Sequence, residues 1–136
     1  MINQIKKIEV FGNTEDFTES FHVLEIGENL FRMAENSVLN HALTLGTEFE
    51  TRTNEVGQFE IIRITKFSDF STKRFILNSQ FNESEYQLLG DEIVRQGGFW
   101  QVDFGSIAIV NLPKDSTLDL EEIFHIFEFN PIEFKD

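Results

Sequence analysis

The clearest pattern in the chain lies in residues 73–134, which read KRFILNSQFNESEYQLLGDEIVRQGGFWQVDFGSIAIVNLPKDSTLDLEEIFHIFEFNPIEF. Apolar runs typical of strands alternate there with two helical patterns, and Gly97-Gly98 is expected to end the first helix. The expected strands are 73–77, 99–104, 107–112 and 127–134, and the expected helices are about 82–96 and 117–126. This order predicts the split βαβ, ferredoxin-like βαββαβ arrangement.

Both expected helices carry start signals. Asn82 is a candidate N-cap, and Glu83 and Glu85 follow in the first turn, where the helix dipole favours acids. Ser116 precedes Asp119 by three positions, which indicates a weak capping box. One face of each helix is apolar: Tyr86, Leu89 and Ile93 in the first, and Leu120, Ile123, Phe124 and Phe127 in the second.

The first half of the chain is expected to be mostly β. Strands are predicted over 2–11, 17–26, 29–33, 45–53 and 58–67, with a hairpin turn at Gly27-Glu28 and another over 54–57. Residues 36–43 fit either one helical turn or an irregular crossing. Residues 69–72 are too short and too poor in Gly and Pro for a flexible linker. The predicted class is therefore α+β: one domain over 1–136, in which a β-rich half (1–68) packs on a ferredoxin-like half (73–134).

Charge narrows the range of partners. Eleven Lys and Arg stand against 24 Asp and Glu, which gives a net charge of −13 spread over both halves. Such a field repels nucleic acids and anionic lipids and attracts cationic proteins. Plain solubility is the alternative explanation. We expect no nucleic-acid partner and no membrane partner.

The chain contains no cysteine, which excludes disulfides, a thiolate nucleophile and a Cys-based zinc site. Residues 1–7 lack an apolar signal core, and no apolar run is long enough to cross a bilayer. A cytoplasmic location is expected.

Aromatic residues leave two interpretations open. There are 16 Phe, which either fill the core or include a few exposed rings in a binding patch. Trp100, the single Trp, is either a core residue or an interface anchor.

No catalytic motif stands out. His22, His41 and His125 are isolated in sequence, and there is no P-loop, Gly-x-Gly-x-x-Gly or Gly-x-Ser-x-Gly pattern. The acid pairs Asp91-Glu92 and Glu121-Glu122 lie on predicted solvent faces, where carboxylates usually stay solvated. We therefore predict no enzyme activity, no cofactor and no metal.

Two segments resemble a family of small uncharacterised bacterial domains of unknown function. Asn36 and the run Leu45-Gly46-Thr47-Glu48-Phe49 are similar to its Asn-centred segment and the turn into a strand, although Ser37-Val38-Leu39 replaces its usual aromatic segment. Ser68, Thr72 and Arg74 fit its Ser-Gly-His-x-Thr-x-Arg frame, but Asp69 and Phe70 stand in place of Gly and His. The resemblance implies an α+β domain without a known activity.

At the level of class, the chain resembles acidic, cysteine-poor bacterial immunity proteins, which bind a cationic toxin domain and block its active site. This resemblance implies a cognate basic toxin or effector as partner. The expected partner-binding residues are Glu85, Asp91, Glu92, Trp100, Glu121 and Glu122. The alternative is a small-ligand-binding or regulatory domain without catalysis, with a pocket between the β half and the sheet. The oligomeric state stays open.

Overall fold

The fold is described from a computed structural model, which describes residues 4–12, 17–38, 40–76, 83–103, 107–122 and 132–133. The chain divides into two compact units, residues 1–69 and 70–136. Each unit buries its own cluster of apolar side chains, so each is described by itself.

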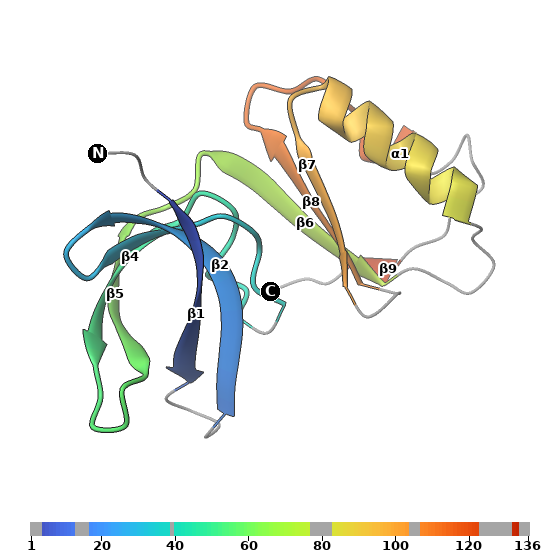
Figure 1. Ribbon diagram of the computed structural model, residues 1–136. Coiled ribbons are helices and arrows are strands. Elements are labelled where there is room, and N and C mark those ends of the chain that lie inside the picture. The colour runs from blue at the N-terminus through green and yellow to red at the C-terminus, as the bar shows by residue number, and fades with distance from the viewer. Residues whose placement is uncertain are drawn as a thin grey trace. The chain divides into compact units, whose positions relative to one another are not determined.

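The first unit is a closed β-barrel (Figure 1). Its strands are β1 (Ile5–Gly12), β2 (Phe17–Gly27), β3 (Leu30–Met33), β4 (Glu48–Thr53) and β5 (Phe59–Lys66). Consecutive strands pair antiparallel, and β1 and β5 close the barrel in parallel through Val10 and Phe59. The prediction of a β-rich first half, with strands close to these bounds, is confirmed by these elements.

The barrel core follows from period-two alternation along the strands. In β4, Phe49 and Thr51 are buried, while Glu48 and Glu50 are half-buried on the other side. The buried apolar cluster consists of Ile8, Val10, Phe21, Val23, Phe31, Met33, Leu43 and Phe49, with Phe59 and Ile61 packed against it. Phe67, by contrast, is 74% exposed. Core filling is therefore confirmed for most of these rings, and an exposed binding patch of Phe residues stays a prediction.

Local backbone chemistry explains the two hairpin turns of the barrel. Between β2 and β3, Asn29 adopts the left-handed conformation (φ 57°), which Asn tolerates better than most residues. Between β4 and β5, Gly57 takes φ 84°, and the Asn54 Oδ1 atom accepts hydrogen bonds from the backbone N–H groups of Val56 and Gln58. The second turn lies where the sequence predicts it, and the first lies one residue later, at Glu28-Asn29.

The second unit is a four-stranded antiparallel sheet with α1 (Glu83–Arg95) beside it (Figure 1). Its strands are β6 (Phe70–Ile76), β7 (Phe99–Asp103), β8 (Ile107–Pro113) and β9 (Ile132–Glu133), in the order β7-β8-β6-β9. The buried cluster joins α1 to one face of the sheet and comprises Phe75, Leu89, Ile93, Ala108, Val110, Leu112 and Leu120, with Trp100 and Leu118 against it.

The end of α1 confirms the stop signal predicted at Gly97-Gly98. Gly97 takes φ 83°, its N–H donates to the Val94 carbonyl (2.9 Å), and the Gly98 N–H donates to the Ile93 carbonyl (2.9 Å). These two bonds form a Schellman motif, which satisfies carbonyls that the helix itself leaves free. A Cβ at Gly98 would lie 2.5 Å from the Asn111 carbonyl oxygen, so the chain approaches β8 closely there.

The predicted fold class is wrong. Among the residues that the structure describes, strands far outnumber helical residues, so the fold is mostly β and is not an α+β chain with a ferredoxin-like βαββαβ half. The physical reason is the small share of helix among the described residues: α1 has 13 residues, and the described elements of the first unit are all strands. The packing of one half on the other, the single domain over 1–136 and the boundaries 1–68 and 73–134 stay predictions.

The second expected helix also starts later than predicted. Residues 117–119 are not helical, and helical residues begin at Leu120. The Asp119 Oδ1 atom accepts a hydrogen bond from the Glu122 N–H (3.2 Å), which makes Asp119 the N-cap. Ser116 instead accepts the Leu118 N–H (3.2 Å) in the preceding turn. Residues 123–126, the rest of this helix prediction, and most of the strand predicted over 127–134 lie outside the described residues.

Candidate functional site

The predicted partner-binding residues all belong to the second unit. Leu89 and Ile93 of α1 and Leu120 of the later helical segment enter one core on one face of the sheet. The outward sides of α1 and of residues 119–122 therefore lie on that same face of the unit. Over residues 83–122 the sequence has nine acids and two bases, Arg95 and Lys114. We call the outward side of α1 and residues 113–122 the acidic layer.

Helix α1 carries three of the expected residues. Asp91 is exposed. Glu92 is half-buried and bound within the helix, because its carboxylate accepts hydrogen bonds from Arg95 (2.7 Å) and from Gln96 (3.3 Å). Glu85 is in α1, and its side chain lies outside the described part. Of these two carboxylates, that of Asp91 is exposed to solvent, whereas the charge of Glu92 is largely balanced by Arg95.

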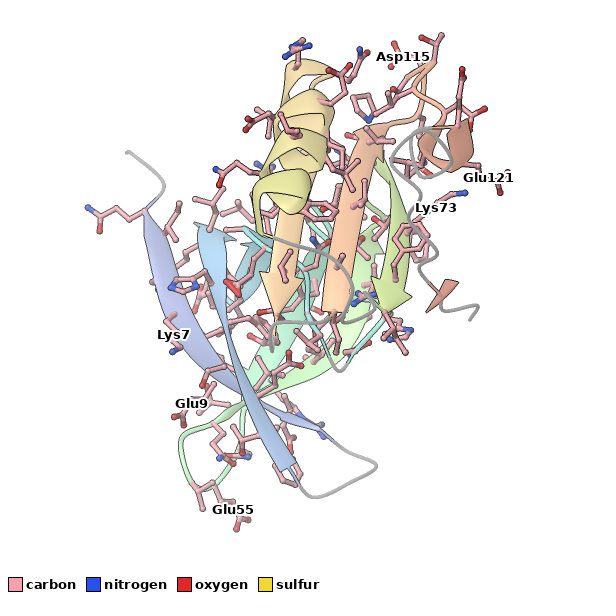
Figure 2. The ribbon with its side chains drawn as sticks, turned by 90° about the vertical axis from the view of Figure 1, so that its right-hand side faces the viewer. Lys7, Glu9, Glu55, Lys73, Asp115 and Glu121 are labelled. Carbon is pink, nitrogen blue, oxygen red and sulfur yellow. The ribbon has the colours of Figure 1, made fainter. Side chains whose placement is uncertain are left out.

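Residues 113–122 carry the other acids. Glu121 and Glu122 are exposed, as is Asp115, and Figure 2 shows Asp115 and Glu121 pointing outward. Within the described residues, none of the three takes part in an ion pair. Asp115 was missed in the sequence; the Pro113-Lys114-Asp115 turn directly after β8 was the available signal.

A hollow of about 340 Å³ lies beside these acids in the second unit. It is lined by backbone and side chains of β6, the end of β8 and the following loop: Ser71, Lys73, Leu112, Pro113, Lys114, Ser116, Thr117, Leu118, Asp119, Leu120 and Glu121. The lining combines two lysines, three hydroxyls and two carboxylates. It can therefore hydrogen-bond a polar ligand of either charge.

Trp100 lies under α1. It is half-buried and packs against the core cluster, and its Cδ1 atom would be 2.8 Å from a Cβ at Gly90. The close approach of helix and indole gives Trp100 a structural role, and its role as an interface anchor stays a prediction. Among the described side chains of α1, the exposed apolar ones are Leu88 (56%) and Val94 (60%). Leu88 and Val94 interrupt the polar side of α1. Their positions in the helical pattern could have indicated exposed apolar residues from the sequence.

In the barrel, by contrast, acids face bases across neighbouring strands. The described ion pairs are Lys6–Glu25 (2.8 Å), Arg32–Glu48 (3.0 Å), Arg52–Glu60 (3.0 Å), Arg63–Glu50 (3.1 Å) and, in the following loop, Lys66–Asp69 (3.5 Å). Glu9 and Glu55 point outward in Figure 2 without a described ion pair. Five acids of the first unit are thus paired with a base, whereas Glu9 and Glu55, like Asp91, Glu121 and Glu122 of the acidic layer, have no ion pair among the described residues.

The histidines lie apart. The His22 Nδ1 and Glu35 Oε2 atoms are 2.6 Å apart at the barrel surface, His41 is exposed, and His125 lies outside the described part. Among the described residues, His, Asp and Glu side chains form no group of three or more that could hold a metal ion. Within the same residues, no helix has the length and apolar character needed to cross a bilayer.

Some of the residues that resemble the uncharacterised family, Asn36, Leu45 and Ser68, meet in one loop of the barrel, whereas Thr72 and Arg74 lie on β6 of the second unit. The buried Asn36 accepts the Leu45 N–H through Oδ1 (2.8 Å), and the Ser68 hydroxyl donates to the Leu45 carbonyl (2.6 Å). Nearby, the buried Ser37 donates to Glu19 Oε1 (2.6 Å). These contacts tie the described parts of the connection between β3 and β4, residues 34–38 and 40–47, to the barrel. Their visible role is structural.

Comparison with known proteins supports the fold alone. No family model matches the chain, and no curated protein matches it. One solved structure is similar, a hypothetical protein from Neisseria gonorrhoeae, with a TM-score of 0.62 and 17% sequence identity over 94% of this chain and 89% of that one. At this identity the likeness concerns the fold.

Proposed function

We propose that the protein is a non-catalytic immunity protein that binds a cognate cationic toxin domain and blocks its active site. The observation that supports it is the uneven pairing of acids. Barrel acids such as Glu48 and Glu60 have basic partners on the neighbouring strand, whereas Asp91, Glu121 and Glu122 of the acidic layer have none within the described residues. Exposed carboxylates of one sign are suited to meet a partner of the opposite sign.

At such an interface, charge would govern the association rate and apolar contact the dissociation rate. The carboxylates would raise the association rate, to roughly 10⁸ M⁻¹s⁻¹ at low ionic strength, because complementary fields steer the encounter. Leu88 and Val94, exposed on either side of Asp91 in the sequence of α1, would lose contact with water and lower the dissociation rate. The proposed site of action is the cytoplasm, where the partner's active domain would be neutralised.

The test uses the product of the neighbouring gene as the candidate partner. The association rate is measured by surface-immobilised binding for the wild type and for a layer variant, Asp91→Asn with Glu121→Gln and Glu122→Gln. A barrel variant, Glu9→Gln with Glu28→Gln and Glu55→Gln, changes the net charge by the same amount. We expect the layer variant to associate about 10-fold more slowly and the barrel variant only about 2-fold more slowly, because steering depends on charge close to the interface.

Three results would contradict the proposal. The neighbouring gene product does not bind; the two variants lose the same amount of rate; or the rate does not fall as salt is raised from about 0.05 M to about 0.5 M, although screening shortens the Debye length over that range.

The second candidate function is binding of a small polar ligand, which the hollow between β6 and residues 112–121 favours. Its volume of about 340 Å³ falls in the range of ligand sites, and Lys114, Ser116 and Thr117 line it. Thermal shift against a metabolite panel tests it. A ligand that raises the melting temperature of the wild type and not of a Lys114→Ala, Thr117→Val variant would favour this function over protein binding.

A further inference from the structure

Among the described strands, β7 lies at one end of the sheet order β7-β8-β6-β9. It pairs with β8 without a register shift from Phe99 to Asp103. Natural edge strands usually carry a lysine, a proline or a bulge that discourages further pairing. The sequence of β7, FWQVD, has none of these, and its single charged residue, Asp103, stands at the end of the strand. In an antiparallel pair every second residue points its N–H and C=O away from its neighbour, so β7 can accept one more strand.

The side chains of β7 are self-complementary. The register with β8 places Trp100 and Val102 on the face that α1 covers, and Phe99, Gln101 and Asp103 on the other. If a second β7 pairs antiparallel about Gln101, Trp100 lies opposite the partner's Val102, and Phe99 opposite the partner's Asp103. Aromatic residues opposite β-branched ones stabilise a strand pair, and no like charges are directly opposed.

The exposed part of the strand fits this arrangement. Val102 is 39% exposed at the edge, although it lies on the apolar face of the sheet. The Gln101 side chain donates to Asp103 Oδ2 (2.6 Å) within its own strand, so the central pair does not depend on a new side-chain contact. Pairing would cover Val102 with the partner's indole.

We infer that β7 is a self-association edge, through which a second copy of this chain joins two four-stranded sheets into one continuous sheet. This inference does not rest on the proposed function. Because each chain carries a net charge of −13, the two copies repel one another at low salt. Added salt screens this repulsion and is expected to strengthen the dimer, whereas it would weaken a complex with a cationic partner.

Sedimentation equilibrium of the whole chain tests the inference. In about 0.5 M NaCl, where exposed charges are screened, the mean mass is expected to rise with concentration from 15.8 kDa towards twice that value. Val102→Lys places a charge at the proposed seam and is expected to raise the dimer dissociation constant at least ~10-fold. Val56→Lys, at a 77% exposed barrel position, is the matched control and should leave the constant unchanged.

A covalent trap keeps the test independent of stability effects at position 102. The chain lacks cysteine, and directly opposed antiparallel residues have Cα atoms about 4.5–5.5 Å apart, within disulfide reach. Gln101→Cys should therefore form a disulfide dimer under mild oxidation much faster than Val56→Cys. A mass that stays at 15.8 kDa at every concentration and salt, equal effects of the two lysine variants, or equal rates of cross-linking would each overturn the inference.

Discussion

Gly90 and Trp100 lie so close that a Cβ at position 90 would be 2.8 Å from the indole Cδ1 atom. Alanine favours a helix over glycine by about 1 kcal/mol. Overpacking a core usually costs about 1–3 kcal/mol, and a ring held between helix and sheet moves aside less readily than a flexible side chain. Gly90→Ala is therefore expected to lower the free energy of unfolding by about 1 kcal/mol, measured by urea denaturation.

Two further variants serve as controls for this prediction. Gln87→Ala, at an exposed position of α1, should change the free energy of unfolding by less than about 0.5 kcal/mol. Adding Trp100→Phe to Gly90→Ala should cost less than the sum of the single changes, because the smaller ring leaves room for the methyl group. Strict additivity would show that contact between the two residues is not the cause.

The loop between β3 and β4 should depend on one buried amide. Asn36→Ala removes the acceptor for the Leu45 N–H, a bond of 2.8 Å at a side chain only 1% exposed. A buried donor without its partner costs about 1–3 kcal/mol, and that loss is expected in chemical denaturation. The exposed Asn40, whose Oδ1 accepts the Ala42 N–H, is the control, and Asn40→Ala should cost clearly less. Equal losses would refute a special role for Asn36.

Phenylalanines in the first unit should differ sharply in how much their replacement by alanine lowers the free energy of unfolding. Phe49 is fully buried between Phe21 and Phe31, with ring centroids 6.3 Å and 5.9 Å away. Phe49→Ala is expected to cost about 3–5 kcal/mol, because it removes apolar contact and leaves a cavity. Phe67→Ala, at a 74% exposed position, should stay within about 0.5 kcal/mol. Melting temperatures and urea midpoints of the two variants provide the comparison.

The start of the second helical segment can be tested by its two candidate caps. Asp119 Oδ1 accepts the Glu122 N–H, whereas Ser116 accepts the Leu118 N–H in the turn before. Loss of an N-cap usually costs about 1 kcal/mol. We expect that loss for Asp119→Ala in thermal unfolding and a smaller one for Ser116→Ala. The reverse order would place the cap at Ser116, as the sequence first indicated.

Local sequence signals predicted the individual strands and the first helix better than they predicted the fold class. The alternation of Phe49 and Thr51 with Glu48 and Glu50 located β4, and Gly97-Gly98 located the end of α1. Closure of the barrel was not predicted, since the pairing of Val10 with Phe59 depends on the twist of the whole meander and leaves no local pattern. The class was wrong because strands dominate the described residues, while α1 has only 13 residues and the second helical segment begins at Leu120 instead of about residue 117.

The candidate site was predictable only where one helix determines it. Helical spacing placed Asp91 on the solvent side of α1, as observed. The ion pairs between barrel strands could not be predicted, because they depend on strand register, as for Arg32 opposite Glu48. The surroundings of Trp100 depend on where α1 crosses β7. A glycine inside the helix, Gly90, was the available sign of that close approach.

The parallel seam of the barrel has a consequence for synthesis on the ribosome. Among the described pairings of the barrel, Val10 with Phe59 alone joins strands that are not consecutive, 49 positions apart. A nascent chain can therefore form the hairpins one after another as an open ribbon. Until Phe59 emerges, the outer side of β1 remains available to other unfinished chains, so the last strand to be made is also the one that shields the first.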